Sequence, residues 1–311
     1  NDAVYEKLLE IFKKYDIRYF FYNGGNDSMD TCNKISEYMA TQDYECRIIG
    51  VPKTIDNDLV GTDHCPGFGS SAKYIALSVA EVIKDVHVYD RDAIVVIEVM
   101  GRHAGWLTAS TCVLRANGET APHLIYLPES QFSAEKFIAD VNNKLKQHSS
   151  VIVAVSEGVE LADMDFRSGK VDTFGHKYLS GLGKCLENLV TDKIGCKVRS
   201  IELNVLQRAS SLTLSKTDVD ESENVGREAV KAILNGETRS MIAIIRNEDY
   251  NISYETVDVS KVCNKEKTFP TEWIINKNDI SDDFIEYVSP IIKGNLEVSR
   301  DDNGLPKYLK R

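Results

Sequence analysis

The strongest constraint on the fold is a repeated alternation of short apolar runs with longer segments of helical periodicity. Apolar runs rich in β-branched or aromatic residues occupy residues 17–22, 46–51, 93–100, 124–127, 151–156, 198–206 and 240–245. Between them, apolar residues recur at spacings of three and four, as in the segments 28–39, 132–147 and 220–234. Strands that alternate with helices form parallel sheets that are covered by helices on both faces. We therefore expect an α/β protein with mostly parallel sheets.

Composition limits the classes of protein to which the chain can belong. Its 311 residues are 42% hydrophobic and 27% charged, which suits one large or two medium-sized domains with buried cores. The net charge of −11 argues against nucleic acid or an anionic membrane as a partner, although a few local Arg and Lys side chains can still bind a phosphorylated substrate. No apolar run approaches the roughly 20 residues that span a bilayer. Seven cysteines without a C-x-x-C pair indicate reduced thiols and a cytoplasmic location.

The loop Pro52–Asp58, here called the aspartate loop, carries the strongest functional signal. It holds two carboxylates, Asp56 and Asp58, and Lys53 and Thr54 stand just before them. Carboxylates can act as a metal ligand and as a base, and a lysine with a hydroxyl can hold phosphate. Phosphoryl transfer needs those parts and little covalent chemistry. A solvated acidic loop is the structural alternative, but the four side chains together favour a functional site.

Two further polar loops follow apolar runs. The glycine loop, Gly24–Ser28, closes the first run, and the arginine loop, Met100–Arg102, closes another. Ligands of parallel α/β sheets bind at the carboxyl ends of the strands, so we expect the three loops to converge on one site. A simple strand-to-helix turn explains the glycine loop about as well as a phosphate site does. Glu157, Arg199 and Arg208 also lie near the ends of apolar runs, and a surface charge explains each of them alone at least as well.

Other known site patterns are absent or weak. The chain has no G-x-x-x-x-G-K-[ST], which excludes an ordinary P-loop. The segment Gly67–Ala72 imitates the dinucleotide pattern G-x-G-x-x-A, but a polar loop precedes it in place of a strand, which favours a tight turn into a helix. The six histidines form no cluster with metal-ligand spacing, so we expect no structural zinc site.

The three loops, in this order, resemble those of the phosphofructokinase family. The matching motifs are Gly-Gly-x-x-Ser, Pro-x-Thr-Ile-Asp-Asn-Asp, Met-Gly-Arg, Ser-Glu-Gly and a Gln-Arg strand end, over roughly residues 15–250. The resemblance implies an α/β fold of two Rossmann-like lobes with mostly parallel sheets. It divides the chain into a phosphoryl-donor lobe, residues 1–67 plus 207–311, and a fructose 6-phosphate lobe, residues 68–206.

Two positions distinguish the branches of this family by phosphoryl donor. ATP-dependent members have Gly where this chain has Asp27 and Lys53, and both residues resemble the pyrophosphate-dependent branch. A carboxylate at position 27 adds bulk and negative charge where a nucleotide α-phosphate would lie, and Lys53 adds a cation for the donor phosphates. The resemblance therefore implies transfer from pyrophosphate to O1 of fructose 6-phosphate, which gives fructose 1,6-bisphosphate and phosphate. An ATP-dependent phosphofructokinase and a catalytically silent regulatory subunit are the alternatives.

The resemblance also implies a role for each matching residue. Asp56 would take the proton of the 1-hydroxyl, Thr54 would donate a hydrogen bond to the donor phosphate, and Arg102 would stabilise charge on the transferring group; these three are the expected catalytic residues. The donor would bind at Gly25, Asp27, Ser28 and Lys53, and Mg²⁺ would bind at Asn26, Asp27 and Asp58. The sugar phosphate would bind at Thr54, Asp56, Met100, Gly101, Arg102, Glu157, Arg199 and Arg208. In this family one of the two arginines at the 6-phosphate usually comes from a neighbouring subunit, which implies a homo-oligomer.

Three departures from the family pattern bear on these roles. Asn26 stands where many relatives have Asp, so Asp27 or a water would take over part of the Mg²⁺ site. Val205 stands where many relatives carry a histidine for the sugar phosphate. Family members open with a strand and a Gly-rich phosphate-binding loop before the first helix seen here. We therefore expect an N-terminally incomplete chain, which by itself would be unstable or inactive.

Overall fold

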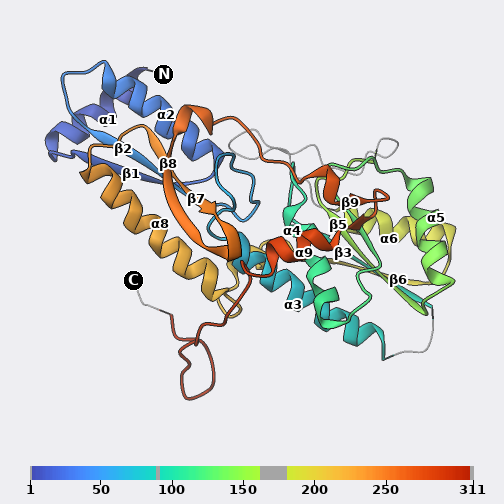
Figure 1. Ribbon diagram of the computed structural model, residues 1–311. Helices are drawn as coiled ribbons and strands as arrows, with labels where there is room; N and C mark the ends of the chain where they lie inside the picture. The colour runs from blue at the N-terminus through green and yellow to red at the C-terminus, as the bar shows by residue number, and fades with distance from the viewer. Residues whose placement is uncertain (1, 89–91, 162–180, 309–311) are drawn as a thin grey trace. The chain divides into compact units, whose positions relative to one another are not determined.

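The computed structural model of the chain describes residues 2–88, 92–161 and 181–308. Contacts within the chain divide it into two compact units. Unit 1 comprises Asn1–Phe68 and Asp218–Lys267, and unit 2 comprises Gly69–Thr217 and Thr268–Arg311. Each unit is built on its own four-stranded sheet with helices on both faces (Figure 1). Among the helices of these ranges, none combines the length and the apolar character that a membrane span requires.

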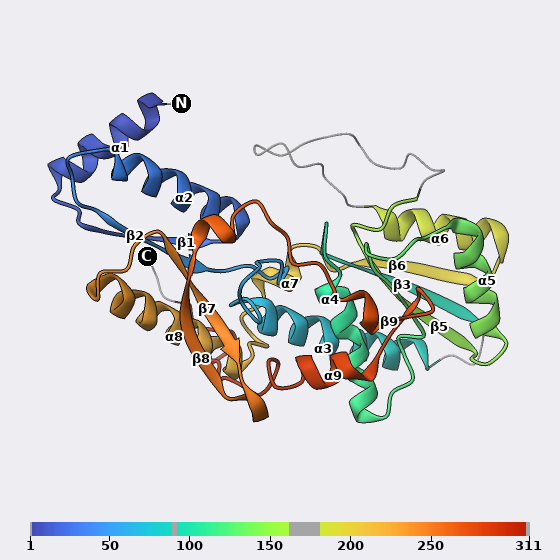
Figure 2. The same cartoon turned by 45° about the horizontal axis from the view of Figure 1, so that its top comes forward.

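The sheet of unit 1 has the order β1-β2-β7-β8. Its strands are β1 (Tyr19–Gly24), β2 (Arg47–Pro52), β7 (Ser240–Arg246) and β8 (Ile252–Asp258), and its long helices are α1 (Asp2–Lys14), α2 (Asn26–Ala40) and α8 (Lys216–Leu234). The first three strands are parallel, and β8 pairs with β7 in the antiparallel direction. Helices α1 and α2 cover one face of this sheet and α8 covers the other (Figure 1 and Figure 2).

Alternate side chains of strand β2 in unit 1 pack into two separate hydrophobic cores, one on each face of the sheet. Ile48 packs with Phe12 of α1 and Met29 of α2. Ile49, the next residue, packs with Val225 of α8 on the opposite face. Successive residues of a strand point to opposite faces of the sheet, so a strand that is covered on both faces has to be apolar at every position. This explains the uninterrupted apolar runs in the sequence.

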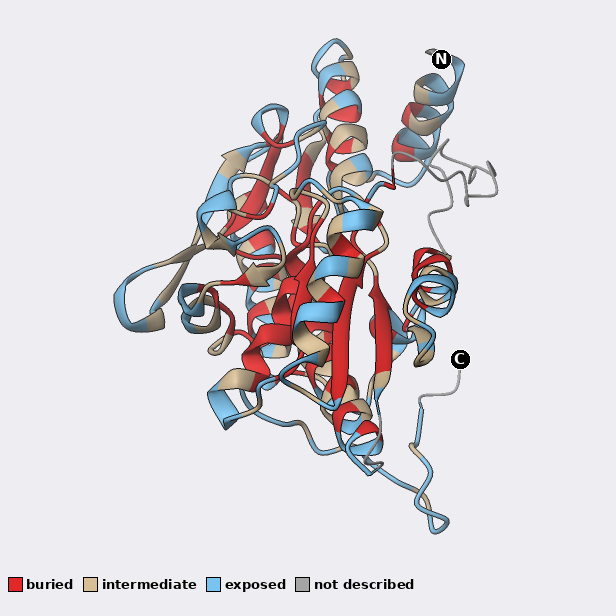
Figure 3. Ribbon diagram, turned by 90° about the vertical axis from the view of Figure 1, so that its right-hand side faces the viewer, coloured by how far each residue is buried: buried red, intermediate tan, exposed pale blue. Residues whose placement is uncertain are grey.

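The sheet of unit 2 is parallel throughout and has the order β4-β5-β3-β6. Its strands are β3 (Ala93–Val99), β4 (Leu124–Tyr126), β5 (Ser150–Ser156) and β6 (Lys197–Glu202), and its helices include α3 (Phe68–Val86), α4 (Trp106–Ala109), α5 (Ala134–Leu145) and α6 (Leu182–Lys193). The strands β3 and β5 are almost entirely buried (Figure 3). Ile94 and Val96 of β3 pack with Phe137 of α5 and Leu186 of α6. Val95, which points to the other face, lies against α3.

The part of the chain that begins at Thr268 belongs to unit 2. It contains β9 (Ile274–Ile275), β10 (Asp279–Ile280) and α9 (Asp282–Val288). Its aromatic side chains enclose Trp106 of α4: ring centroids lie 5.1 Å apart for Trp106 and Phe269, and 4.9 Å apart for Phe269 and Phe284. Trp273 completes this aromatic cluster. The two compact units divide the chain after Phe68, Thr217 and Lys267, whereas the resemblance placed its lobe boundaries at residues 67 and 207.

The expected α/β class with mostly parallel sheets is confirmed, and the differences are local. β8 was not anticipated, and it adds an antiparallel edge to the unit 1 sheet. The strand expected at 198–206 ends at Glu202, and the short helix α7 (Leu206–Ala209) follows it. The remaining helical turns are of the 3-10 type: Ser110–Asn117, Glu248–Tyr250, Val259–Lys261 and Thr271–Trp273.

Candidate active site

The glycine loop and the aspartate loop meet at the carboxyl end of the unit 1 sheet. Gly24 at the end of β1 is the register partner of Pro52 at the end of β2. The Lys53 N–H donates to the Gly24 carbonyl oxygen, 2.9 Å away. A Cβ placed on Gly25 would lie 3.6 Å from the Cβ of Thr54. The parallel pairing of β1 with β2 therefore brings these two predicted loops together.

The glycine loop leads directly into α2. Gly24 is required there, because a Cβ at this position would lie 2.0 Å from the Ser28 Oγ. Asn26, Asp27 and Ser28 form the first turn of α2, and Gly25 precedes this turn without providing a side-chain cap. The N–H groups of a first turn lack intrahelical acceptors and carry the positive end of the helix dipole. This turn is therefore suited to an anion such as a phosphate group.

Thr54 organises the two carboxylates of the aspartate loop. Its Oγ1 accepts a hydrogen bond of 3.1 Å from the Asp56 N–H. The same hydroxyl donates to the Asp58 carboxylate. The proton of Thr54 is thus engaged inside the loop, whereas the resemblance assigned it to the donor phosphate. Asp56 itself is half-buried on a backbone that Thr54 holds in place.

Each of the two loops holds one buried oxygen that has no hydrogen-bond partner in the described residues, Oδ1 of Asn26 and Oδ1 of Asp58. The Asn26 amide is oriented by its Nδ2, which donates to the Lys265 carbonyl oxygen at 2.7 Å. Burial raises the pKa of Asp58, and the charge of nearby Glu266 adds to this effect, so a cation would stabilise the ionised carboxylate.

These oxygens fit the metal that the resemblance implies. Mg²⁺ is commonly held by one or two carboxylates together with substrate phosphates, without a complete protein cage. The described part of the chain contains no group of three or more His, Cys, Asp or Glu side chains placed to hold a metal ion. Asp27, the third residue expected at the metal, is exposed on the first turn of α2.

The arginine loop lies in unit 2, where it meets Glu157. The Gly101 N–H donates to the Glu157 Oε1 at 3.3 Å, and the Ser156 Oγ donates to the Gly101 carbonyl oxygen at 2.6 Å. The pairing of β3 with β5 produces this contact, because Val99 and Ser156 are register partners. Gly101 has a φ of +137°, and a Cβ there would lie 2.6 Å from the carbonyl oxygen of Ala104. Only glycine suits this position.

The two arginines expected at the 6-phosphate occupy different settings. Arg199 is exposed in the middle of the edge strand β6, opposite Val95 of β3, and lies well before the end of β3 that delivers Met100. Arg208 is exposed in helix α7, so the expected strand end at 207–208 was wrong. Arg199 takes no part in the hydrogen bonds described above that join Gly101 to Glu157 and Ser156.

Two further side chains bind backbone groups of unit 2. Gln207, the first residue of the Gln-Arg motif, is buried, and its Oε1 accepts from the Met100 N–H of the arginine loop at 3.3 Å. Glu129, which no motif indicated, accepts from the Gly105 N–H at 3.0 Å and from the Phe269 N–H at 2.7 Å. The motif contained Gln207 but did not reveal its contact, because that contact depends on the folded loop.

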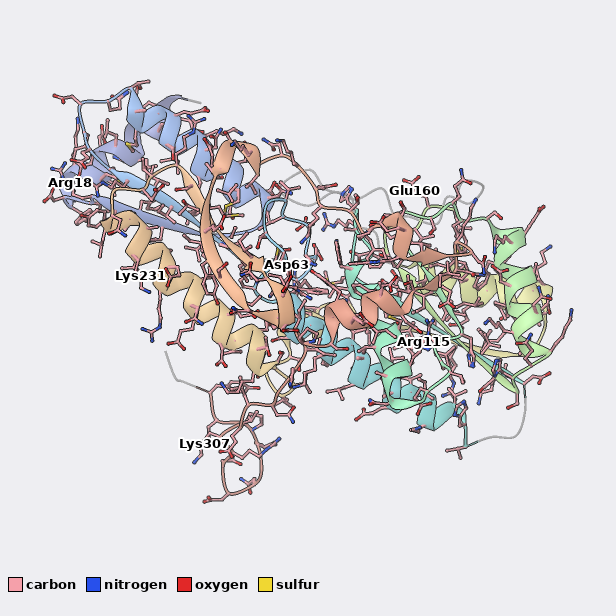
Figure 4. The ribbon with its side chains drawn as sticks, in the orientation of Figure 1. Arg18, Asp63, Arg115, Glu160, Lys231 and Lys307 are labelled. Atoms are coloured by element: carbon pink, nitrogen blue, oxygen red, sulfur yellow. The ribbon has the colours of Figure 1, made fainter. Side chains whose placement is uncertain are left out.

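A network of charged side chains forms around His64, a few residues after the aspartate loop. The ring nitrogens of the buried His64 lie 2.7 Å from Asp63 and 2.6 Å from Glu221, and Arg246 pairs with Asp63 at 2.9 Å. Figure 4 labels Asp63, whose N–H donates to a carbonyl oxygen of β7 (Figure 4). Burial acts to lower the pKa of His64, but the hydrogen bonds to Asp63 and Glu221 outweigh it and raise the pKa. The next residue, Cys65, donates its N–H to Asn57 of the aspartate loop at 2.9 Å.

Comparison with known proteins assigns the fold and these loops to one family. Residues 1–233 match the family described as Phosphofructokinase. The chain belongs to the phosphofructokinase family. It is 40% identical over 313 residues to a protein of Halomonas elongata named pyrophosphate–fructose 6-phosphate 1-phosphotransferase, and the match covers 98% of this chain and 74% of that protein.

Solved phosphofructokinase structures resemble this one over nearly its whole length. A pyrophosphate-dependent phosphofructokinase from Nitrosospira multiformis superposes with a TM-score of 0.88 and 38% identity, covering 99% of this chain and 76% of that chain. Its counterpart from Marinobacter aquaeolei gives a TM-score of 0.86 and 37% identity, covering 97% of this chain and 74% of that chain. Both agree with the resemblance that the loop motifs indicated.

Proposed function

We propose that this protein is a pyrophosphate-dependent 6-phosphofructokinase. It transfers a phosphoryl group from pyrophosphate to O1 of fructose 6-phosphate and produces fructose 1,6-bisphosphate and phosphate. The observation that carries the proposal is the junction of the glycine loop with the aspartate loop in unit 1. Asp27 follows that junction in the first turn of α2 and Lys53 lies at it, and the resemblance gives these two positions the choice of donor. The names of the relatives that cover most of this chain support the same reaction.

The donor binds at the first turn of α2 and at Lys53. The N–H groups that follow Gly25 and the hydroxyl of Ser28 hold its phosphate oxygens, and Lys53 adds a charge-assisted contact. The exposed carboxylate of Asp27 occupies the space of a third phosphate and repels it. Asn26, Asp27 and Asp58 would hold Mg²⁺, which would neutralise charge on the donor phosphates when bound.

Asp56 accepts the proton of the 1-hydroxyl as O1 attacks phosphorus. The new P–O1 bond forms while the bond from phosphorus to the bridging oxygen of pyrophosphate breaks, and phosphate leaves with the electron pair. Thr54 keeps both carboxylates of the loop in place through its two hydrogen bonds. The guanidinium of Arg102 stabilises the negative charge on the transferring group.

The sugar phosphate binds to groups of unit 2. Met100, Gly101 and Glu157 contact the sugar, and their mutual hydrogen bonds set the shape of this surface. Arg208 binds the 6-phosphate, and Arg199 performs the same task for a neighbouring copy of the chain. Its place in the middle of an edge strand supports that assignment, so the active form is a homo-oligomer. The seven free cysteines suit a cytoplasmic location.

The direct test is to mix the full-length protein with fructose 6-phosphate, Mg²⁺ and pyrophosphate and to measure fructose 1,6-bisphosphate. We expect steady turnover that stops when pyrophosphate is omitted. Absence of turnover with either pyrophosphate or ATP would refute the proposal and would favour a silent regulatory subunit. Light scattering on the same sample tests the oligomer, since a monomer that is fully active would refute the role given to Arg199.

A further inference from the structure

The residue between the two aspartates of the aspartate loop has an unusual backbone. Asn57 is fully buried and has a φ of +56°, a left-handed conformation that residues other than glycine rarely adopt. Such a conformation persists only where the surroundings enforce it. Because Asn57 links Asp56 to Asp58, whatever fixes its conformation also sets the directions of the two carboxylates.

Lys267 makes two contacts with the aspartate loop and two with residues that follow it. Its backbone N–H donates to the Asp58 carbonyl oxygen at 2.7 Å, and its Nζ donates to the Oδ1 of Asn57 at 3.4 Å. The Nζ also donates to the carbonyl oxygens of Asp63 at 2.7 Å and Thr62 at 3.2 Å. The ammonium group therefore faces acceptors of the protein itself.

The position of Lys267 in the sequence makes these contacts informative. It lies just after β8, more than 200 residues from the loop that it binds. The preceding residue, Glu266, forms an isolated antiparallel bridge with Leu59. The segment at Glu266–Lys267 thus contacts the end of the aspartate loop, with Glu266 bridged to Leu59 and Lys267 bonded to Asp58.

We propose that Lys267 is a positioning residue for phosphoryl transfer, which fixes the backbone between Asp56 and Asp58. This inference rests on the proposed function, because it assigns Asp56 as the base and Asp58 as a metal ligand. Chemistry of this kind depends on placing reacting groups within a fraction of an ångström, and a displacement of about 1 Å lowers rates roughly 10²-fold. Lys267 acts through the loop and touches neither substrate.

The test compares Lys267→Met, which keeps most of the side-chain volume but loses the charge and the donors, with Lys267→Arg, which keeps both. Lys261→Met is the matched control, since Lys261 is an exposed lysine of the same segment. Two readouts are needed: kcat and KM with pyrophosphate and fructose 6-phosphate, and hydrogen exchange of backbone amides. The amide of Cys65 reports on the loop because it donates to Asn57.

For Lys267→Met we expect kcat to fall about 10²-fold while the KM for fructose 6-phosphate stays within about 2-fold. Exchange should accelerate at residues 56–65 and stay unchanged elsewhere in unit 1. Lys267→Arg should recover at least about 10-fold of the lost kcat, and Lys261→Met should behave as the wild type.

Unchanged kcat and exchange in Lys267→Met would overturn the inference, as would a general loss of protection throughout unit 1. Failure of the wild type to use pyrophosphate would instead refute the proposed function, and the exchange data would still test the contacts of Lys267.

Discussion

At the scale of single residues, the aspartate loop separates two tasks that neighbouring side chains perform. Asp56 is half-buried on a backbone held by Thr54, whereas Lys53 is exposed at the junction with the glycine loop. Loss of the first should affect the chemical step, and loss of the second should affect binding of the donor. The two substitutions therefore have different kinetic signatures.

The variant Asp56→Asn should lower kcat by about 10²- to 10⁴-fold, because it removes the base without changing the shape of the side chain. The KM for fructose 6-phosphate should change little. Asp43→Asn, at an exposed aspartate before β2, is the control. A variant with normal kcat in steady-state assays would show that another group takes the proton.

The variant Lys53→Gly should raise the KM for pyrophosphate by roughly 10- to 100-fold, the effect of losing one charge-assisted hydrogen bond of about 1.5–3 kcal/mol. The KM for fructose 6-phosphate should not change. Lys307→Gly provides a control at an exposed lysine far along the sequence. If pyrophosphate use were untouched in Lys53→Gly, the assignment of this lysine to the donor would be wrong.

At the scale of elements, strand β3 carries a buried carboxylate, and burial disfavours its charged form. Glu98 is buried, and its Oε2 accepts from the Gly183 N–H in the first turn of α6 at 2.6 Å. Burial raises the pKa of Glu98 to about 7, and the charges of Glu202 and Glu157 add to the effect while the Gly183 N–H opposes it. The folded protein thus binds this proton more tightly than the unfolded chain does.

This difference makes unit 2 less stable at high pH. The stabilisation from protonated Glu98 is fully present below pH 4.5, the ordinary pKa, and is lost as the pH rises through about 7. The variant Glu98→Gln should therefore be more stable than the wild type at pH 8, by up to about 3 kcal/mol, with a much smaller advantage at pH 5. Thermal unfolding at both pH values checks this. Glu160→Gln, at an exposed glutamate, should show no such pH dependence, and an equal gain for Glu98→Gln at both pH values would contradict the account.

Elements also show what could be predicted from the sequence and what could not. Fully apolar runs such as 151–156 revealed their strands because both faces of those strands are covered. The strand β8 was missed because its side chains are mostly half-buried or exposed. The sequence predicts one strand over 198–206, but the strand ends at Glu202 and Leu206 begins the short helix that carries Gln207 and Arg208.

The same limit applies to the candidate site. Motif residues such as Asp56 and Arg102 could be named because their types and order carry the chemistry. Lys267 could not be named, and the contact of Gln207 could not be derived from its motif, since both side chains bond to backbone atoms of distant loops. Arg199 was named, but only its position on an edge strand shows how far it lies from Met100 along the sheet.

At the scale of the whole molecule, the chain builds two units, and both of its tryptophans report on one of them. Trp106 and Trp273 lie in the aromatic cluster of unit 2, with ring centroids 6.2 Å apart. Intrinsic tryptophan fluorescence therefore reports on the packing of this aromatic cluster in unit 2, separately from unit 1.

The variant Phe284→Ala should destabilise this unit by about 3–5 kcal/mol, because it leaves a cavity at a fully buried ring. The fluorescence-detected midpoint of denaturant unfolding should fall accordingly. Hydrogen exchange in β1 and β2 of unit 1 should stay as in the wild type. A fluorescence midpoint equal to that of the wild type would show that the aromatic cluster does not hold the segment in place.

The choice of phosphoryl donor is the central claim, and the ratio of kcat/KM for pyrophosphate to kcat/KM for ATP tests it most directly. The measurement uses saturating fructose 6-phosphate and Mg²⁺ with each donor varied in turn. We predict a ratio of at least about 10³, since the charge and bulk of Asp27 exclude the nucleotide while Lys53 holds pyrophosphate. A ratio below one would contradict the account, because it would show that Asp27 and Lys53 do not determine the donor.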